Sequence, residues 1–143
     1  MNIKAITIRQ PWAYLIAAGF KDVENREINR NRGRIKYRGV IYIHAGKKTS
    51  TIRFTQAQED EIDRHPGLRE EIEKAKKMTG MIIGKVEFVN CVRNSDSLWA
   101  TNGMIQIVLK NAKLFNKPLE NVSGRPSIPW NYETSDDFVD NIG

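Results

Sequence analysis

Three residues near the N-terminus have the types and spacing for chemistry: Lys21, Glu24 and Arg26, in the stretch AAGFKDVENREI at 17–28. In a β-strand, residues i and i+2 project from the same face about 6–7 Å apart, so Glu24 and Arg26 can form a charge-assisted pair. Lys21 has the opposite parity in a regular strand, but a turn could re-aim it, so its position stays open. The trio could bind a base edge and a phosphate, or Glu24 could activate a water while Lys21 stabilises an oxyanion. A surface ladder of salt bridges is the alternative.

The segments on either side of this trio indicate how it is positioned. IKAITI at 3–8 contains β-branched residues and predicts a strand. The following apolar residues recur with helical spacing, which predicts a helix over about 10–18. Pro11 suits its first turn, and Gly19 suits a left-handed cap at its end. The trio is therefore expected where this helix passes into a second strand, about 21–28.

The rest of the chain alternates between strand and helix patterns. The glycine at position 84 predicts a bulge or bend within its strand. We expect an α+β domain with about five or six mostly antiparallel strands, helices inserted between the early ones, and a sheet that could close into a barrel. The expected elements are strands at 38–46, 81–92 and 104–115, an edge-like piece at 126–132, and a helical region at 54–78 broken at 65–67.

Length and composition limit the class of protein. The 143 residues suit one domain spanning 1–143, and every apolar run is much shorter than the roughly 20 residues that cross a bilayer. The N-terminus lacks the pattern of a secretory signal, so cytoplasm is the expected compartment. Cys91 is the only cysteine, which excludes an internal disulfide, and with only two histidines we expect no metal site and no cofactor.

The positive charge is concentrated in the first third of the chain. Residues 1–55 hold 12 Lys/Arg and 3 Asp/Glu, a net +9, whereas residues 56–143 hold 11 and 14, a net −3. Basic residues clustered in this way suit a nucleic-acid backbone, and Tyr37 and Tyr42 nearby suit stacked bases. A solvated loop is the alternative. The basic residues of this region are Arg30, Arg32, Arg34, Lys36 and Arg38, followed by Lys47, Lys48 and Arg53.

Other candidate residues carry weaker signals. AGKKTS at 45–50 is not a phosphate-binding loop, because Ile41 stands where a glycine is required and Lys48 where a hydroxyl is required. His44 lies in an apolar strand, which favours a core or cleft-edge position over catalysis. Trp12 and Trp130 are predicted to be core residues, although Trp130 could edge a pocket.

The trio belongs to a longer pattern that resembles the ASCH family. The family signature is Gly-x-Lys-x-x-Glu-x-Arg, matched here by Gly19, Lys21, Glu24 and Arg26. Four residues alone would be weak evidence, but the resemblance also covers later segments in the same order and so extends over nearly the whole chain. These segments are QPW at 10–12, GVIYIHAGKK at 39–48, GMIIGKVEFVNCV at 80–92 and NAKLFNKPLENVSGRPSIPW at 111–130.

The resemblance implies a PUA-like β-barrel with helices capping a cleft lined by the signature residues, and an expectation of RNA or other nucleic-acid binding. Some small bacterial relatives are amidohydrolases that deacetylate acetylcytidine with a lysine and a threonine of this segment and a later glutamate. Lys21 matches that lysine, but Glu24 replaces the threonine nucleophile. Deacetylase activity therefore does not transfer. Ribonuclease activity, attributed to some relatives, is neither supported nor excluded by these residues.

Two hypotheses follow. In the first, the protein binds nucleic acid, with Glu24 accepting from a base amino group and basic residues contacting phosphates. In the second, it hydrolyses a modified nucleoside or an RNA bond, with Glu24 as general base and Lys21 as electrostatic stabiliser. A protein-interaction scaffold fits the acidic helical region only generically. The expected ligand-binding residues are Gln10, Trp12, Lys21, Glu24, Arg26, Arg30, Arg32, Arg34, Lys36, Arg38, His44, Lys47, Lys48 and Trp130.

Overall fold

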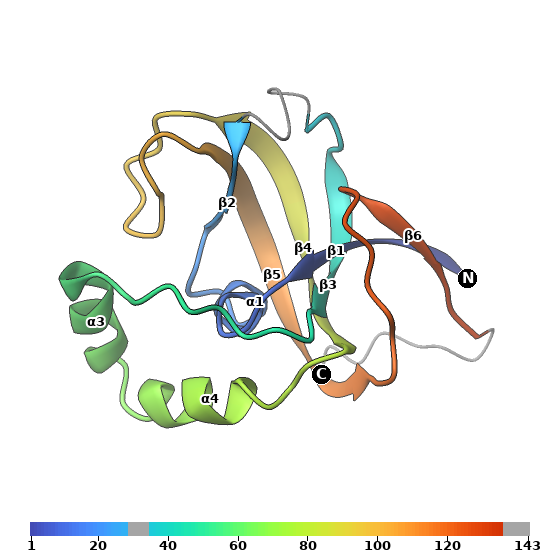
Figure 1. Ribbon diagram of the computed structural model, residues 1–143, viewed down its shortest axis with the longest axis horizontal. Helices are drawn as coiled ribbons and strands as arrows, with labels where there is room; N and C mark the ends of the chain where they lie inside the picture. Colours follow the sequence, from blue (N-terminus) through green and yellow to red (C-terminus); the bar gives the residue numbers. More distant parts are fainter. Residues whose placement is uncertain (29–34, 136–143) are drawn as a thin grey trace.

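The computed structural model describes residues 1–28 and 35–135. Strands and short helices alternate in its first half, and strands dominate the second (Figure 1). The elements are β1 (Asn2–Ile8), α1 (Trp12–Ala17), β2 (Val23–Arg26), β3 (Gly39–Ala45), α3 (Gln56–Asp63), α4 (Leu68–Ala75), β4 (Met81–Val92), β5 (Ile105–Leu119) and β6 (Trp130–Glu133).

The strands form one six-stranded sheet in the order β2-β5-β4-β3-β1-β6. Strands β1 and β3 pair in parallel, and the other four described pairs are antiparallel. Long β4 and β5 curve together, so the sheet curls into a half-barrel (Figure 1). The α+β, mostly antiparallel, PUA-like architecture expected from the sequence is confirmed.

The predicted irregularity at Gly84 is confirmed. Just before this residue, between Ile82 and Gly84, the register of β4 shifts against both neighbouring strands, β3 and β5. A Cβ on Gly84 would overlap the carbonyl oxygen of Lys113 and lie 2.9 Å from the Cβ of Ala17. The glycine therefore allows α1 and β5 to approach β4 closely.

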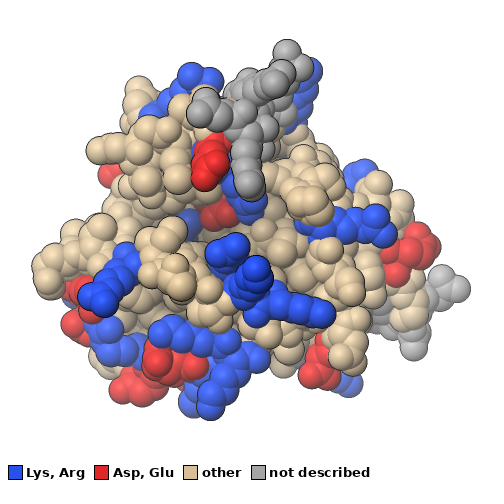
Figure 2. Space-filling model, viewed as in Figure 1, with Lys and Arg blue, Asp and Glu red and all other residues tan. Residues whose placement is uncertain are grey.

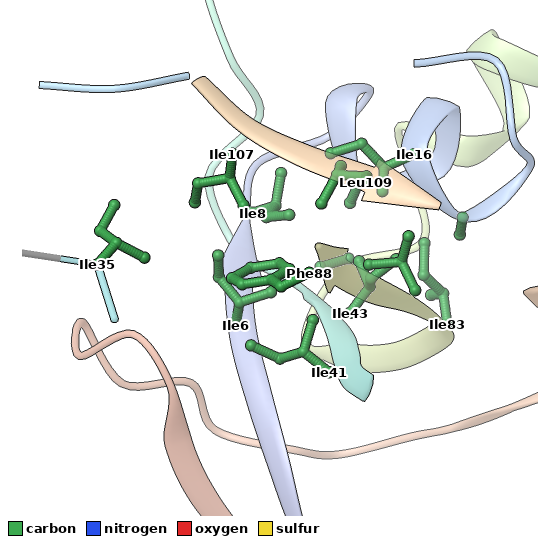
Figure 3. Packing of buried hydrophobic residues seen from close by; sticks show 14 of the residues in the cluster. Ile6, Ile8, Ile16, Ile35, Ile41, Ile43, Ile83, Phe88, Ile107 and Leu109 are labelled. Carbon is green, nitrogen blue, oxygen red and sulfur yellow. The ribbon is translucent and has the colours of Figure 1, made fainter. Parts of the chain in front are cut away.

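The main core lies inside the curl of the sheet (Figure 3). Strand β1 contributes Ile6 and Ile8, β4 contributes Phe88, and α1 covers this layer with Ile16. Burying such side chains is worth about 1.5–3 kcal/mol each, which is the main force holding helix and sheet together. The cluster further includes Ile35, Ile41, Ile43, Ile83, Ile107 and Leu109.

Helices α3 and α4 lie next to each other at the end of the molecule opposite β6 (Figure 1). Thr55 begins α3 with a capping box: its hydroxyl accepts from the Gln58 N–H, and the Gln58 side chain accepts from the Thr55 N–H. Buried Ile62 and Ile72 pack toward α1. The predicted helical region at 54–78, broken at 65–67, is thus confirmed as two helices.

Element bounds differ in detail from the sequence-based expectation. The strand expected at 104–115 continues to Leu119, because it remains paired with β4 as far as Ile82. The strand expected at 21–28 is only Val23–Arg26, since Lys21 is held by the preceding helix. The edge-like piece expected at 126–132 becomes β6, which pairs with β1 at the edge of the sheet.

Candidate functional site

The turn between α1 and β2 decides where Lys21 points. Gly19 adopts the predicted left-handed conformation, with φ +88°. The chain then folds back so that the N–H groups of Phe20 and Lys21 both donate to the carbonyl of Leu15, each at 2.9 Å. This turn directs the Lys21 side chain inward, toward Glu24.

Glu24 lies between two cations. Its Oε1 is 3.3 Å from Lys21 Nζ, and its Oε2 accepts from Arg26 Nε at 3.0 Å and lies 2.8 Å from Arg26 Nη2. Glu24 and Arg26 therefore share one face of β2, as their spacing predicts. Arg26 Nη2 also donates to the Thr7 carbonyl at 3.1 Å, which ties β2 to β1.

The three side chains are buried to different extents, Arg26 least and Lys21 most. The Arg26 side chain is 24% exposed, whereas those of Glu24 and Lys21 are 10% and 4% exposed. Burial lowers the pKa of Lys21, and the neighbouring Glu24 carboxylate opposes that shift. Lys21 Nζ also lies 5.7 Å from the centre of the Trp12 ring, in cation–π range.

A cleft of about 480 Å³ opens where Arg26 reaches the surface. Strands β1, β2 and β3 form one wall, and the segment between β5 and β6 forms the other. Arg26, Lys47 and Arg125 all line this cleft, and no Asp or Glu among residues 1–28 and 35–135 does. The remaining lining residues are Ile6, Thr7, His44, Gly46, Ser123, Gly124, Pro126 and Ile128.

A buried hydrogen-bond chain forms the floor of the cleft. His44 Nε2 is 2.7 Å from the Val122 carbonyl, which can only accept, so Nε2 carries the proton and donates. His44 Nδ1 then accepts from the Thr7 hydroxyl at 3.1 Å, and Thr7 in turn accepts from Trp130 Nε1 at 3.1 Å. Burial lowers the pKa of His44, which keeps the ring in this neutral form. The chain ties the 122–125 segment to β1 and β3.

Gly124 is the point at which that segment meets the floor. A Cβ at this position would lie 2.5 Å from Thr7 Oγ1 and 2.7 Å from His44 Nδ1. Only a glycine backbone can approach the two side chains so closely. Arg125, the next residue, is thereby placed at the cleft.

A second cavity of about 550 Å³ adjoins the first. The two share Lys47 and Ser123, and the second is otherwise lined by Thr79, Gly80, Asn121 and Val122. Lys47 therefore stands between the two cavities. Within the part of the chain that the structure describes, it is the one charged residue lining the second cavity.

The candidate ligand-binding residues separate into two groups. Arg26, His44 and Lys47 line the cleft, and Trp130 lies directly beneath it, packed edge-on against His44 at 5.5 Å. Gln10, by contrast, is fully buried: its amide nitrogen donates to the Met78 carbonyl, and its oxygen accepts from the Tyr14 N–H.

The other candidates that the structure describes lie away from both cavities. Trp12 packs edge-on against Phe54 at 5.1 Å and against Trp99 at 6.5 Å. Arg38 is exposed but donates to the carbonyls of Ile35 and Tyr37 in its own segment. Exposed Lys36 and Lys48 line neither cavity, Tyr42 is buried in the sheet, and Arg30, Arg32 and Arg34 fall outside the described residues.

Sequence reasoning missed Arg125, Ser123 and Thr7. The triplet Ser-Gly-Arg at 123–125 was part of the family resemblance, but nothing local to it indicates contact with β1. A glycine flanked by polar residues between two apolar segments was the available signal. It did not reveal that Gly124 contacts Thr7, because these two residues are 117 positions apart in the sequence.

Lys and Arg side chains gather across the middle of the face shown in Figure 2. Over α3 and α4, at the lower left of that view, acidic and basic side chains are mixed, as the exposed pairs Lys74–Glu71 and Lys76–Glu73 illustrate. On this face, Lys and Arg side chains therefore gather in the middle, whereas over α3 and α4 they alternate with acidic ones.

No helix among the described residues is long and apolar enough to cross a membrane. Within the same residues, no group of three or more His, Cys, Asp or Glu side chains is arranged to hold a metal ion.

The curled mixed sheet, the capping helices and the signature residues beside a cleft define an α+β domain of the PUA-like type. The family model for the ASCH domain matches residues 6–119, and the chain belongs to this family. The match includes the trio, the end of β1 and all of β2 to β5, and it stops before Arg125. A comparison with curated proteins found no match.

Proposed function

We propose that this protein binds nucleic acid, RNA in particular, by holding backbone phosphates in the cleft. The observation that carries this proposal is the lining of the cleft, which contains three cations and, within the described part of the chain, no carboxylate. Arg and Lys side chains gathered in a concave site are the groups that neutralise phosphates and release counterions. RNA is proposed ahead of DNA because the ASCH domain suggests an RNA-binding type of fold.

Each cation has a distinct role in this proposal. Glu24 and the Thr7 carbonyl engage Nε and Nη2 of Arg26, and Nη1 makes neither of these bonds. Arg26 is therefore a fixed phosphate contact, oriented by the buried pair behind it. Lys47 and Arg125 are exposed and adapt to the backbone. Among the residues that the structure describes, no Phe, Tyr or Trp lines the cleft, so phosphate contacts rather than base stacking supply the affinity.

Hydrolysis receives less support from the same geometry. Lys21 and Glu24 line neither cavity, and the Glu24 carboxylate is occupied by two cations. A general base needs to reach a proton of the substrate or of a water molecule. We therefore assign Lys21 and Glu24 to the positioning of Arg26 and keep hydrolysis as the second candidate.

Binding of a labelled single-stranded RNA, followed by fluorescence anisotropy at low salt, tests the proposal. Lys47→Gln and Arg125→Gln each remove an exposed charge, so both variants should fold and should bind about five- to tenfold more weakly. Lys74→Gln on α4 is the matched control, since that lysine is 74% exposed and lines neither cavity. Wild-type protein that binds no RNA, or Lys47 and Arg125 variants that bind like the control, would contradict the proposal.

A further inference from the structure

The second cavity differs in chemistry from the first, although they adjoin. Three cations line the first, whereas Thr79, Asn121 and Ser123 supply two hydroxyls and an amide to the second. Within the described residues, no hydrogen bond engages these three side chains. The second cavity therefore offers uncharged donors and acceptors, with the Lys47 ammonium at its border.

The rim of the second cavity is held by backbone hydrogen bonds. Gly80 N–H donates to the Ala45 carbonyl at 2.7 Å, and Val122 N–H donates to the Gly80 carbonyl at 2.9 Å. Asn121 adopts a left-handed conformation, with φ +58°. These bonds join the ends of β3 and β4 to the segment after β5, so the polar side chains are presented from a fixed frame.

We infer that the second cavity is a nucleoside subsite, an assignment that rests on the proposed function. A nucleotide has an anionic phosphate joined to an uncharged sugar and base. The first cavity, lined by cations, matches the phosphate, and the second, lined mainly by uncharged polar groups, matches the sugar and base. With the phosphate held beside Lys47 in the first cavity, the sugar and base enter the second. The Asn121 amide offers a donor and an acceptor to a base edge, and the hydroxyls of Thr79 and Ser123 suit the sugar or the base.

The volume of the second cavity is large enough for a nucleoside. A cavity of about 550 Å³ falls within the range of roughly 300–1,000 Å³ that is typical of small-molecule sites. A second phosphate would be a poor occupant, because Lys47 is the sole cation there among the described residues and already borders the first cavity. The site thus distinguishes a nucleotide from a bare phosphate.

The test compares inorganic phosphate with the nucleoside 5′- and 3′-monophosphates, titrated against the full chain and followed by NMR shifts. Asn121→Gly removes the amide and keeps the left-handed backbone, and Thr79→Val removes a hydroxyl with little change in shape. Each should weaken binding of at least one nucleotide about fivefold and leave phosphate binding unchanged. Asn111→Gly is the matched control, since Asn111 also has a left-handed φ, +57°, but lies on β5 and donates to Glu87.

The outcomes separate the inference from the proposed function. Nucleotides that bind wild type no more tightly than phosphate would overturn the subsite and leave the phosphate cleft standing. Asn121→Gly and Thr79→Val variants that bind every nucleotide like Asn111→Gly would also overturn it. Failure of wild type to bind phosphate, nucleotides and RNA would overturn both.

Discussion

At the scale of single residues, the buried ion pair between Lys21 and Glu24 holds Arg26 in position. A buried lysine is costly unless it is paired, and Glu24 provides the pair at 3.3 Å. The same carboxylate fixes two nitrogens of Arg26, whose planar guanidinium is thereby held in one orientation. Lys21 is thus best understood as a residue that positions Arg26 through Glu24.

His44 gives the protein a testable pH dependence. Its pKa in the folded state lies below the ordinary value of about 6.5, because the ring is buried, with 1% of the residue exposed, and its hydrogen bond to the Val122 carbonyl opposes that shift only in part. Between about pH 6.5 and the lower folded-state pKa, the unfolded chain binds the proton more readily. The free energy of unfolding therefore falls as the pH drops through this window, by at most about 1.4 kcal/mol per pH unit from this residue.

Urea denaturation from pH 7.5 to pH 5 measures this effect. His44→Gln keeps a nitrogen able to donate to the Val122 carbonyl but does not titrate, so its stability should fall less over this range than that of wild type. His65→Gln, which changes the other histidine of the chain, is the comparison variant. Equal pH dependence in His44→Gln and wild type would contradict the role assigned to His44.

At the scale of elements, the site depends on how closely α1 lies against the sheet. The end of α1 sends Lys21 inward, and the contact between Ala17 and the bulged part of β4 sets the depth of that helix. The bulge at Gly84 is therefore part of what places the trio, although Gly84 lies far from it in the sequence.

Gly84→Ala tests this packing. The added methyl group would overlap the backbone of β5 and crowd Ala17, so we expect a loss of about 3 kcal/mol, at the upper end for overpacking. Gly103→Ala is the comparison: nothing lies within 4 Å of a Cβ there, and its φ of +83° should cost about 1 kcal/mol. The midpoints of urea denaturation of the two variants measure these losses of stability. If Gly84→Ala loses no more stability than Gly103→Ala, α1 can shift to accommodate the added methyl group.

At the scale of the whole molecule, charge is distributed unevenly in both sequence and space. Residues 1–55 carry a net +9, whereas the remaining residues carry a net −3. The fold places Arg26 and Lys47 from the basic part beside Arg125 from the acidic part, in one cleft. Such a local cationic site supports association with a polyanion without requiring the whole surface to be basic.

The salt dependence of RNA binding reports on this arrangement. For a single strand, the logarithm of the binding constant falls against the logarithm of salt concentration with a slope of about −0.7 per phosphate neutralised. Arg125→Gln should therefore make the slope shallower by about 0.7, and Lys74→Gln should leave it unchanged. Identical slopes for wild type and Arg125→Gln would mean that Arg125 contacts no phosphate.

Most elements of the fold could be predicted from the sequence, because their causes are local. Apolar periodicity identified α1 and the strands, Gly19 ended the helix as expected, and the i, i+2 spacing placed Glu24 beside Arg26. The parallel pairing of β1 with β3 and the extension of β5 to Leu119 were missed. Both depend on which strands become neighbours, a property that no local pattern encodes.

The amino-acid sequence alone was sufficient for the class of fold, the family and the basic character of the first third of the chain. These follow from hydrophobic patterning, a spaced motif and composition, each of which can be read within a short segment. Folding was required to bury Lys21 and Gln10 and to bring Arg125 to Arg26 and Lys47. The physical reason is that a cleft arises from packing between distant segments, here because Gly124 can approach His44 and Thr7 with no side chain between them.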